Sequence, residues 1–118
     1  MTKINGTQEV LMHHLTAFGE NNIDEIMKDY SEESYLCLPD GKLTGLNSIR
    51  SFFIEAFKLF PAGKTQLDIK QMIIDDDKAY IACSADSPVI SVPMGTDSFE
   101  IENGIIIWHT AALHIISK

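Results

Sequence analysis

The second half of the sequence, from Thr65 to Ile116, consists of apolar strand-like segments joined by short turns. The acidic segment Asp75-Asp76-Asp77-Lys78 and the Asn103-Gly104 pair both have the composition of hairpin connections. They divide this half into expected strands over 65–74, 79–87, 89–101 and 105–116. Because consecutive strands joined by tight turns pair antiparallel, the run predicts a continuous antiparallel sheet whose apolar face must be covered.

The first half of the sequence supplies that cover, because it contains three helix-like segments. Apolar residues recur at helical spacing after Thr7, an expected N-cap, and Asn22 is expected to cap a second, shorter helix. A third helix is expected to begin at Asn47 or Ser48. Helices followed by a curled sheet predict an α+β fold in a single domain over 1–118, with the helices on the concave side.

The charge of the chain limits its partners. Seventeen acidic residues against nine basic ones give a formal net charge of −8. That balance repels nucleic acid and anionic membrane surfaces, so we expect binding to neither. Residues 1–6 contain no apolar signal segment, and no apolar run is long enough to cross a bilayer, which favours a cytoplasmic location.

Asp97 lies in one of the expected strands, and side-chain alternation places it on the apolar face. Asp97, Phe99 and Ile101 share that face, whereas Ser98 and Glu100 point to the opposite, solvent side. A carboxyl group among apolar neighbours either serves the structure or lies in a cavity, where loss of water favours its protonated form. Proton-transfer groups need such a setting, so we expect a small-molecule pocket around Asp97.

Two histidines are candidates to share this pocket. His14 lies on the apolar stripe of the first helix, whereas its neighbour His13 lies on the flank. His109 lies on the last expected strand, and its direction depends on the register of the final hairpin. Each of the two candidates could instead be an ordinary hydrogen-bonded core residue.

The register of the final hairpin has two alternatives. A two-residue turn pairs Phe99 with Trp108 and buries Trp108 rather than His109. A three-residue bulged turn shifts the pairing by one and brings Ile107 and His109 to the side of Asp97. The residues of the hairpin alone leave both registers open.

Metal and cofactor sites are not expected. His13 and His14 are adjacent and point apart on a helix, so they cannot bind one ion, and the aspartates at 75–77 lack the spacing of a calcium loop. Cys37 and Cys83 lie in apolar segments without a second ligand nearby, so we expect small buried hydrophobic side chains rather than a disulfide.

Taken in order along the chain, several short motifs resemble the nuclear transport factor 2-like (NTF2-like) superfamily, in its SnoaL-like polyketide cyclase and ketosteroid isomerase-like branch. The motifs are Asn22-Ile23-Asp24, Asp29-Tyr30-Ser31, Leu38-Pro39-Asp40-Gly41, Ile49-Arg50-Ser51-Phe52-Phe53, Gly95-Thr96-Asp97-Ser98-Phe99 and Asn103-Gly104-Ile105-Ile106. The resemblance covers nearly the whole chain. It implies a cone-shaped α+β barrel, three N-terminal helices packed on a curved antiparallel sheet, enclosing a pocket.

The resemblance also implies roles for particular residues. The protonated aspartate of the isomerases' oxyanion hole falls on Asp97, and their oxyanion-hole tyrosine falls on His14. It places Ile107 and His109 toward the cavity and so favours the bulged register. Their general-base aspartate, however, falls on Leu38, which cannot transfer a proton.

We therefore expect a pocket for a small hydrophobic ligand, in which Asp97, His14 and His109 carry cofactor-independent acid/base chemistry on a carbonyl compound. Cyclisation, isomerisation and dehydration are reactions of this type. The side chains expected to contact the ligand are Phe53, Phe57, Tyr80 and Phe99. The alternative is a non-catalytic ligand-binding domain of the same fold. With His109 inward, Trp108 faces out on an apolar sheet surface, which predicts a homodimer through that face.

Overall fold

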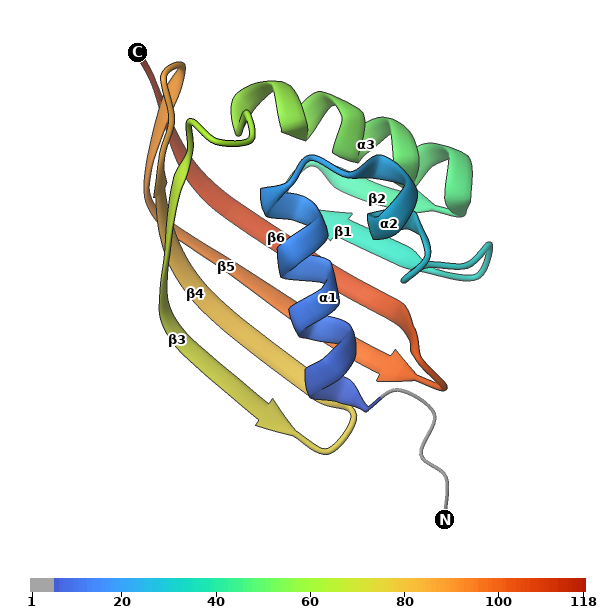
Figure 1. The fold of residues 1–118 in the computed structure, drawn as a ribbon. Helices are drawn as coiled ribbons and strands as arrows, with labels where there is room; N and C mark the ends of the chain where they lie inside the picture. Colours follow the sequence, from blue (N-terminus) through green and yellow to red (C-terminus); the bar gives the residue numbers. More distant parts are fainter. Residues whose placement is uncertain (1–5) are drawn as a thin grey trace.

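In the computed structural model, which describes residues 6–118, the helices lie on one face of a strongly curved sheet (Figure 1). Residues 1–5, the start of the segment expected to lack a signal sequence, lie outside the described residues. The elements in chain order are α1 (Thr7–Gly19), α2 (Ile23–Met27), β1 (Tyr35–Leu38), β2 (Gly41–Thr44), α3 (Leu46–Leu59), β3 (Gln66–Asp75), β4 (Lys78–Asp86), β5 (Ile90–Glu102) and β6 (Ile105–Ser117).

The described strands form a six-stranded sheet in the order β2-β1-β6-β5-β4-β3. Neighbouring strands are antiparallel except β1 and β6, which run parallel. The predicted α+β fold with three helices and a curved sheet is confirmed, but the expectation of a wholly antiparallel sheet is wrong at this pair. The short first strand adds to the free edge of the last strand and extends the β3–β6 meander by the β1–β2 hairpin.

The start of α2 agrees with the sequence prediction, and the start of α1 does not. Asn22 Oδ1 accepts a hydrogen bond from the Glu25 backbone N–H at 3.2 Å, as an N-cap does. The N-cap of α1 is Gly6 rather than Thr7. Thr7 Oγ1 instead donates to the Asp76 carbonyl at 2.6 Å and thereby ties α1 to the β3–β4 turn.

The start of α3 also differs from the expected one. The N-cap is Gly45 rather than Asn47 or Ser48, and it has a positive φ of 87° that favours glycine. The first free N–H of the helix is satisfied from outside, because Glu32 Oε1 accepts from Leu46 N at 2.9 Å.

The β5–β6 hairpin keeps a two-residue turn, and a bulge follows that turn within β6. Ile101 pairs with Ile106, whereas Phe99 pairs with His109, so Ile107 is the extra residue. His109 therefore lies on the inner face. The expectation that Ile107 also faces inward is wrong, because Ile106 occupies that position and is fully buried.

Contacts from the segment between α2 and β1 stabilise this bulge. The Ile106 N–H donates to the Asp29 carbonyl at 2.7 Å, and Ser34 Oγ donates to the Ile106 carbonyl at 2.6 Å. Both partners lie outside the hairpin, which is why the hairpin sequence leaves its register open. Beyond the bulge Trp108 points to the outer face and is 39% exposed.

The core lies between the helices and the concave face of the sheet. Its largest buried apolar members come from both layers: Val10, Leu11, Ile26, Leu36, Ile49, Phe53, Ile81, Phe99, Ile101 and Ile106. Both cysteines are free; Cys83 is buried as expected, whereas Cys37 is only half-buried. Among the described residues, no helix is long and apolar enough to cross a membrane.

Candidate functional site

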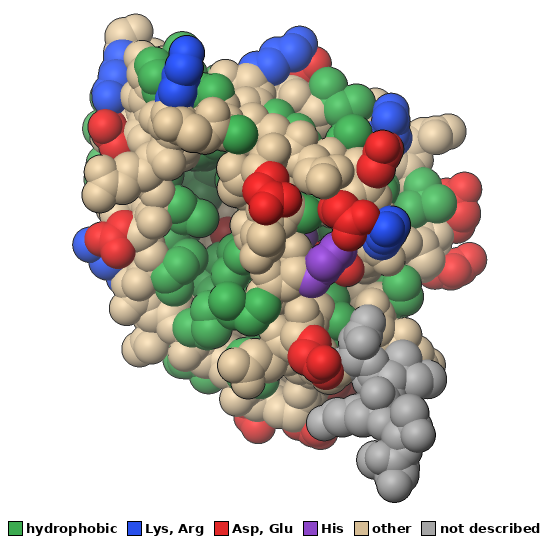
Figure 2. Space-filling model, viewed as in Figure 1, with side chains coloured by type: hydrophobic (Ala, Val, Ile, Leu, Met, Phe, Trp, Pro, Cys, Tyr) green, Lys and Arg blue, Asp and Glu red, His purple; other side chains and the backbone are tan. Residues whose placement is uncertain are grey.

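A cavity of about 90 Å³ lies between α1, α3 and the inner face of strands β3–β6. Figure 2 looks onto a hollow in this part of the surface, bordered mainly by hydrophobic side chains. The lining residues are His14, Leu15, Phe18, Phe52, Phe53, Ala56, Phe60, Leu67, Ile81, Cys83, Ala85, Val92, Asp97, His109, Ala111 and Leu113. The cavity is therefore apolar apart from two histidines, one cysteine and one aspartate.

The structure places His14, Asp97 and His109 together at this cavity, with Phe53 beside them. They come from four different elements, α1, β5, β6 and α3. His14 and Phe53 lie on helical stripes that face the sheet, and the β6 bulge turns His109 toward Asp97. Their proposed chemical roles stay predictions.

The other three expected ligand contacts are absent from the lining of this cavity. Phe99 faces inward but lies behind His109, on which it stacks with ring centroids 4.3 Å apart. Phe57 packs against Phe18 instead, with their ring centroids 5.7 Å apart. Tyr80 is on the wrong face, because its buried neighbours Ala79 and Ile81 point inward and alternation turns Tyr80 outward.

A hydrogen-bonded chain of three side chains ends in the cavity. Tyr30 Oη lies 2.8 Å from His109 Nδ1, and His109 Nε2 lies 2.7 Å from Asp97 Oδ2. Tyr30 and His109 are buried, and the Asp97 side chain is 17% exposed. Both ring nitrogens of His109 are thus engaged by protein groups. Asp97 is the member of the chain whose remaining oxygen can meet a ligand.

Sequence reasoning missed Tyr30, because it shares the apolar face of α2 and its surroundings and looks like a core residue. The only signal was the phenol itself, since a buried tyrosine hydroxyl usually has a hydrogen-bond partner. Burial, and secondarily the charges of Asp97 and Asp29, raise the pKa of Tyr30 well above its usual range. The hydroxyl therefore keeps its proton at physiological pH.

His14 is enclosed by aromatic rings rather than by hydrogen-bond partners. It makes edge-to-face contacts with Phe53, Phe99 and His109, with ring centroids 5.8, 5.4 and 5.5 Å away. Its Nδ1 is buried and has no hydrogen-bond partner in the part of the chain that the structure describes. Burial lowers the pKa of His14 well below its usual value, and His109 and His13 add to that effect. His14 is therefore a neutral imidazole at pH 7.

Cys83 also lines the cavity, although the sequence indicated only a small buried hydrophobic residue. Burial, with a smaller effect of the Asp97 charge, raises the pKa of its thiol to about 11. The group is a protonated thiol at neutral pH and hence a poor nucleophile.

His13 points away from the cavity and binds two carboxylates. Its Nε2 lies 2.8 Å from Glu25 Oε1, and its Nδ1 lies 2.8 Å from Asp29 Oδ2. The hydrogen bond to Glu25, and to a smaller extent the one to Asp29, raises the pKa of His13. The pKa of Asp29 is raised as well, because burial of this carboxyl outweighs the opposing effect of His13. These contacts join α1 to the end of α2, one residue before Tyr30.

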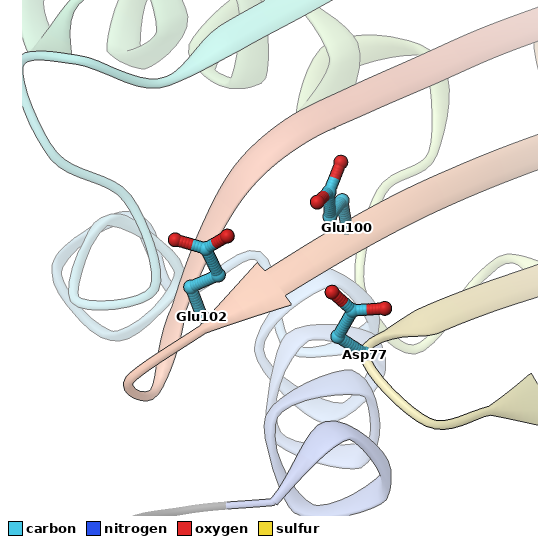
Figure 3. Close-up of side chains that lie close together, drawn as sticks. All are labelled: Asp77, Glu100 and Glu102. Carbon is cyan, nitrogen blue, oxygen red and sulfur yellow. The ribbon is translucent and has the colours of Figure 1, made fainter.

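A second group of acids lies outside the cavity. Figure 3 shows the carboxylates of Asp77, Glu100 and Glu102, from the β3–β4 turn and β5, close together, and one oxygen of each lies within 4.8 Å of the others. Lys78 Nζ lies 3.1 Å from Asp77 Oδ1 and offsets part of this charge. Glu100 alternates with the inward-facing Phe99, so the group lies on the opposite face of β5 from the cavity.

The comparisons with known proteins identify the fold. No protein-family model matches the sequence, and no curated protein sequence matches it either. Among solved structures, a candidate ketosteroid isomerase from Kribbella flavida superposes with a TM-score of 0.75 at 16% identity, covering 92% of this chain and 77% of that one. An NTF2-like protein of unknown function from Cytophaga hutchinsonii gives 0.75 at 12% identity, covering 96% and 93%.

A candidate polyketide cyclase from Sinorhizobium meliloti gives a TM-score of 0.71 at 17% identity, covering 86% of this chain and 92% of that one. Identities this low show the fold alone. The chain has the NTF2-like fold, and the resemblance noted in the sequence is confirmed at that level.

Proposed function

We propose that this protein is a cofactor-independent acid/base enzyme acting on a small, uncharged carbonyl compound. The observation that supports the proposal best is the pair formed by Asp97 and His109, whose Oδ2 and Nε2 atoms lie 2.7 Å apart in the lining of a mainly apolar cavity. Among residues 6–118, none that lines the cavity is Lys or Arg, so an anionic ligand would meet Asp97 without a compensating cation from this part of the chain.

The proposed step is a proton transfer next to a carbonyl group. Asp97 Oδ1 takes a proton from the carbon beside the carbonyl, and the electron pair of the broken C–H bond moves onto the carbonyl oxygen as an enolate. The neutral imidazole of His14 donates a hydrogen bond to that oxygen. Return of the proton to another carbon would complete an isomerisation, and attack of the enolate carbon on a second carbonyl would complete a cyclisation.

The test measures this elementary step directly, because the full reaction is not required. Small cyclic ketones such as cyclopentanone and cyclohexanone are incubated with the protein in D2O, and deuterium uptake beside the carbonyl is followed by NMR. We expect uptake above the buffer rate, lost in Asp97→Asn and reduced in His14→Phe. Glu100→Gln is the matched control, since it changes a carboxylate on the outer face of the same strand.

A second candidate is a ligand-binding domain without catalysis. The observation that favours it is Leu38, which stands where the resemblance places the general base of the isomerases. Ketones that raise the melting temperature of the protein but exchange no deuterium beyond the buffer rate would support this candidate and contradict the enzyme proposal.

We also propose a homodimer through the outer face of the sheet. Trp108 lies beside Tyr35 of the neighbouring strand, and the two side chains are 39% and 41% exposed. Ile73 at the far edge of the same face is 50% exposed. Large aromatic side chains on an otherwise uncovered sheet face are typical anchors of a protein interface.

A further inference from the structure

The hydroxyl of Tyr30 reaches the candidate site through His109 and not directly. Tyr30 is 4% exposed and His109 is 2% exposed, so the 2.8 Å contact between Oη and Nδ1 is shielded from water. The next contact in the chain, from His109 Nε2 to Asp97 Oδ2, is 2.7 Å long. The direction in which protons are donated along this chain decides what Asp97 can offer to a ligand.

The donor and acceptor inventory settles that direction. A phenol that keeps its proton has one O–H to donate, and a buried O–H needs an acceptor. His109 Nδ1 is that acceptor and therefore carries no proton, which leaves Nε2 as the protonated ring nitrogen that donates to Asp97. In the opposite tautomer Nδ1–H would donate to Tyr30 Oη, and the buried Tyr30 O–H would be left without an acceptor among the described residues.

We propose that Tyr30 is a positioning residue: by donating to His109 Nδ1 it holds His109 as the Nε2–H tautomer and presents Asp97 to the ligand as a hydrogen-bond acceptor. Stacking of His109 on Phe99, with 25° between the ring planes, fixes the plane of the imidazole as well. This inference rests on the proposed function only for its effect on turnover. Asp97 then differs from the protonated aspartate that the resemblance implies, because Asp97 accepts a hydrogen bond from His109, whereas a protonated aspartate donates one.

The consequence for the reaction is that a single carboxylate oxygen of Asp97 is left to take the proton from the ligand. Asp97 Oδ2 is used by His109, and Asp97 Oδ1 has no protein hydrogen-bond partner among residues 6–118. When Asp97 Oδ1 takes the proton from the ligand carbon, no bond of Tyr30 or His109 breaks. The ligand therefore has to present its acidic C–H to Asp97 and its oxygen to His14.

The first experiment is histidine 15N NMR on the unliganded wild-type protein, which needs neither substrate nor turnover. We expect His109 to show a protonated Nε2 and an unprotonated Nδ1 that accepts a hydrogen bond. A protonated Nδ1 in the wild type would overturn the proposal. This result stands whether or not any variant folds.

The second experiment compares Tyr30→Phe with Tyr35→Phe, a matched control in which an exposed phenol loses the same hydroxyl. In Tyr30→Phe the His109 Nδ1 resonance should move toward that of a free imine nitrogen, because its donor is gone. It should stay in place in Tyr35→Phe. An unchanged resonance in Tyr30→Phe would count against the assignment of Tyr30.

Rates in the ketone exchange assay distinguish a failure of this inference from a failure of the proposed function. In the ketone exchange assay, Tyr30→Phe should lower kcat roughly two- to tenfold with KM unchanged, as expected when a hydrogen bond that positions the base is lost. A raised KM with unchanged kcat would show that Tyr30 contacts the ligand, which contradicts a positioning role. If the NMR result is as expected but no ketone exchanges deuterium, the proposed function fails and the tautomer assignment stands.

Discussion

Replacing His14 with Phe should stabilise the protein, although His14 lies in its core. The Nδ1 atom is buried without a hydrogen-bond partner among the described residues, a situation that costs about 1–3 kcal/mol. Phe keeps the edge-to-face contacts with Phe53 and Phe99, and the adjacent cavity of about 90 Å³ gives the slightly larger ring room. At pH 7.5 we expect the free energy of unfolding to rise by about 1–2 kcal/mol.

The gain should grow as the pH falls. Burial lowers the pKa of His14 well below its value of 6.5 in the unfolded chain, so near pH 5.5 the unfolded state binds a proton that the folded state does not. The wild-type protein therefore keeps its full stability above pH 6.5 and loses part of it as the pH falls through that value, because protonation favours the unfolded chain. From pH 7.5 to 5.5 this loss amounts to about 1.4 kcal/mol, and His14→Phe escapes it. The variant should then exceed the wild type by about 3 kcal/mol at pH 5.5.

Urea unfolding followed by circular dichroism at the two pH values measures both quantities. The control is His109→Phe, at a histidine with a similar degree of burial. That change leaves the Tyr30 hydroxyl and Asp97 Oδ2 without their partner and should destabilise the protein by about 2–4 kcal/mol. A His14→Phe variant less stable than the wild type at both pH values, or a difference that does not change with pH, would refute the reasoning.

Three further predictions follow from other parts of the molecule. Hydrogen bonds, the stronger effect from Glu25 and the weaker from Asp29, raise the pKa of His13, so the stability that protonated His13 contributes is present below pH 6.5 and is lost as the pH rises. His13→Gln should therefore lower the free energy of unfolding by under about 1 kcal/mol at pH 6 and leave it unchanged at pH 9. An equal loss at both pH values would contradict this. Trp108→Glu should sediment as a monomer whereas the wild type sediments as a dimer; a monomeric wild type at micromolar concentration would refute the interface. Since burial raises the pKa of Cys83 to about 11, iodoacetamide at pH 8 should alkylate the half-buried Cys37 first, and preferential labelling of Cys83 would argue against that burial.

Local patterns were sufficient to predict the layers of the fold and the direction of most side chains. The helical stripe in α1 placed His14 toward the sheet and His13 on the flank, as the structure has them. Alternation along β5 placed Asp97 and Phe99 on the inner face. These assignments succeed because each depends on the period of a single element, which short-range sequence determines.

Features that depend on contacts between distant segments could not be predicted in the same way. The bulge at Ile107 is stabilised by Asp29 and Ser34, which lie more than seventy residues earlier in the chain. The parallel pairing of β1 with β6 joins equally distant segments. The expected contact of Tyr80 with the ligand differs from both, because it conflicts with the period of its own strand: Ala79 and Ile81 occupy the inner face of β4 and turn Tyr80 outward.

The bulge also decides which group lies beside Asp97 in the site. Without it Trp108 would lie opposite Phe99, and Asp97 would have no imidazole beside it. With it, His109 Nε2 lies 2.7 Å from Asp97 Oδ2, and in the proposed tautomer it donates a hydrogen bond to this carboxylate. Leu38 leaves the position of the isomerases' base without a titratable group, so on the proposed mechanism Asp97 must act as the base itself. The oxygen of the ligand then depends on neutral His14 alone, which is why loss of His14 and loss of Asp97 should affect deuterium exchange to different degrees.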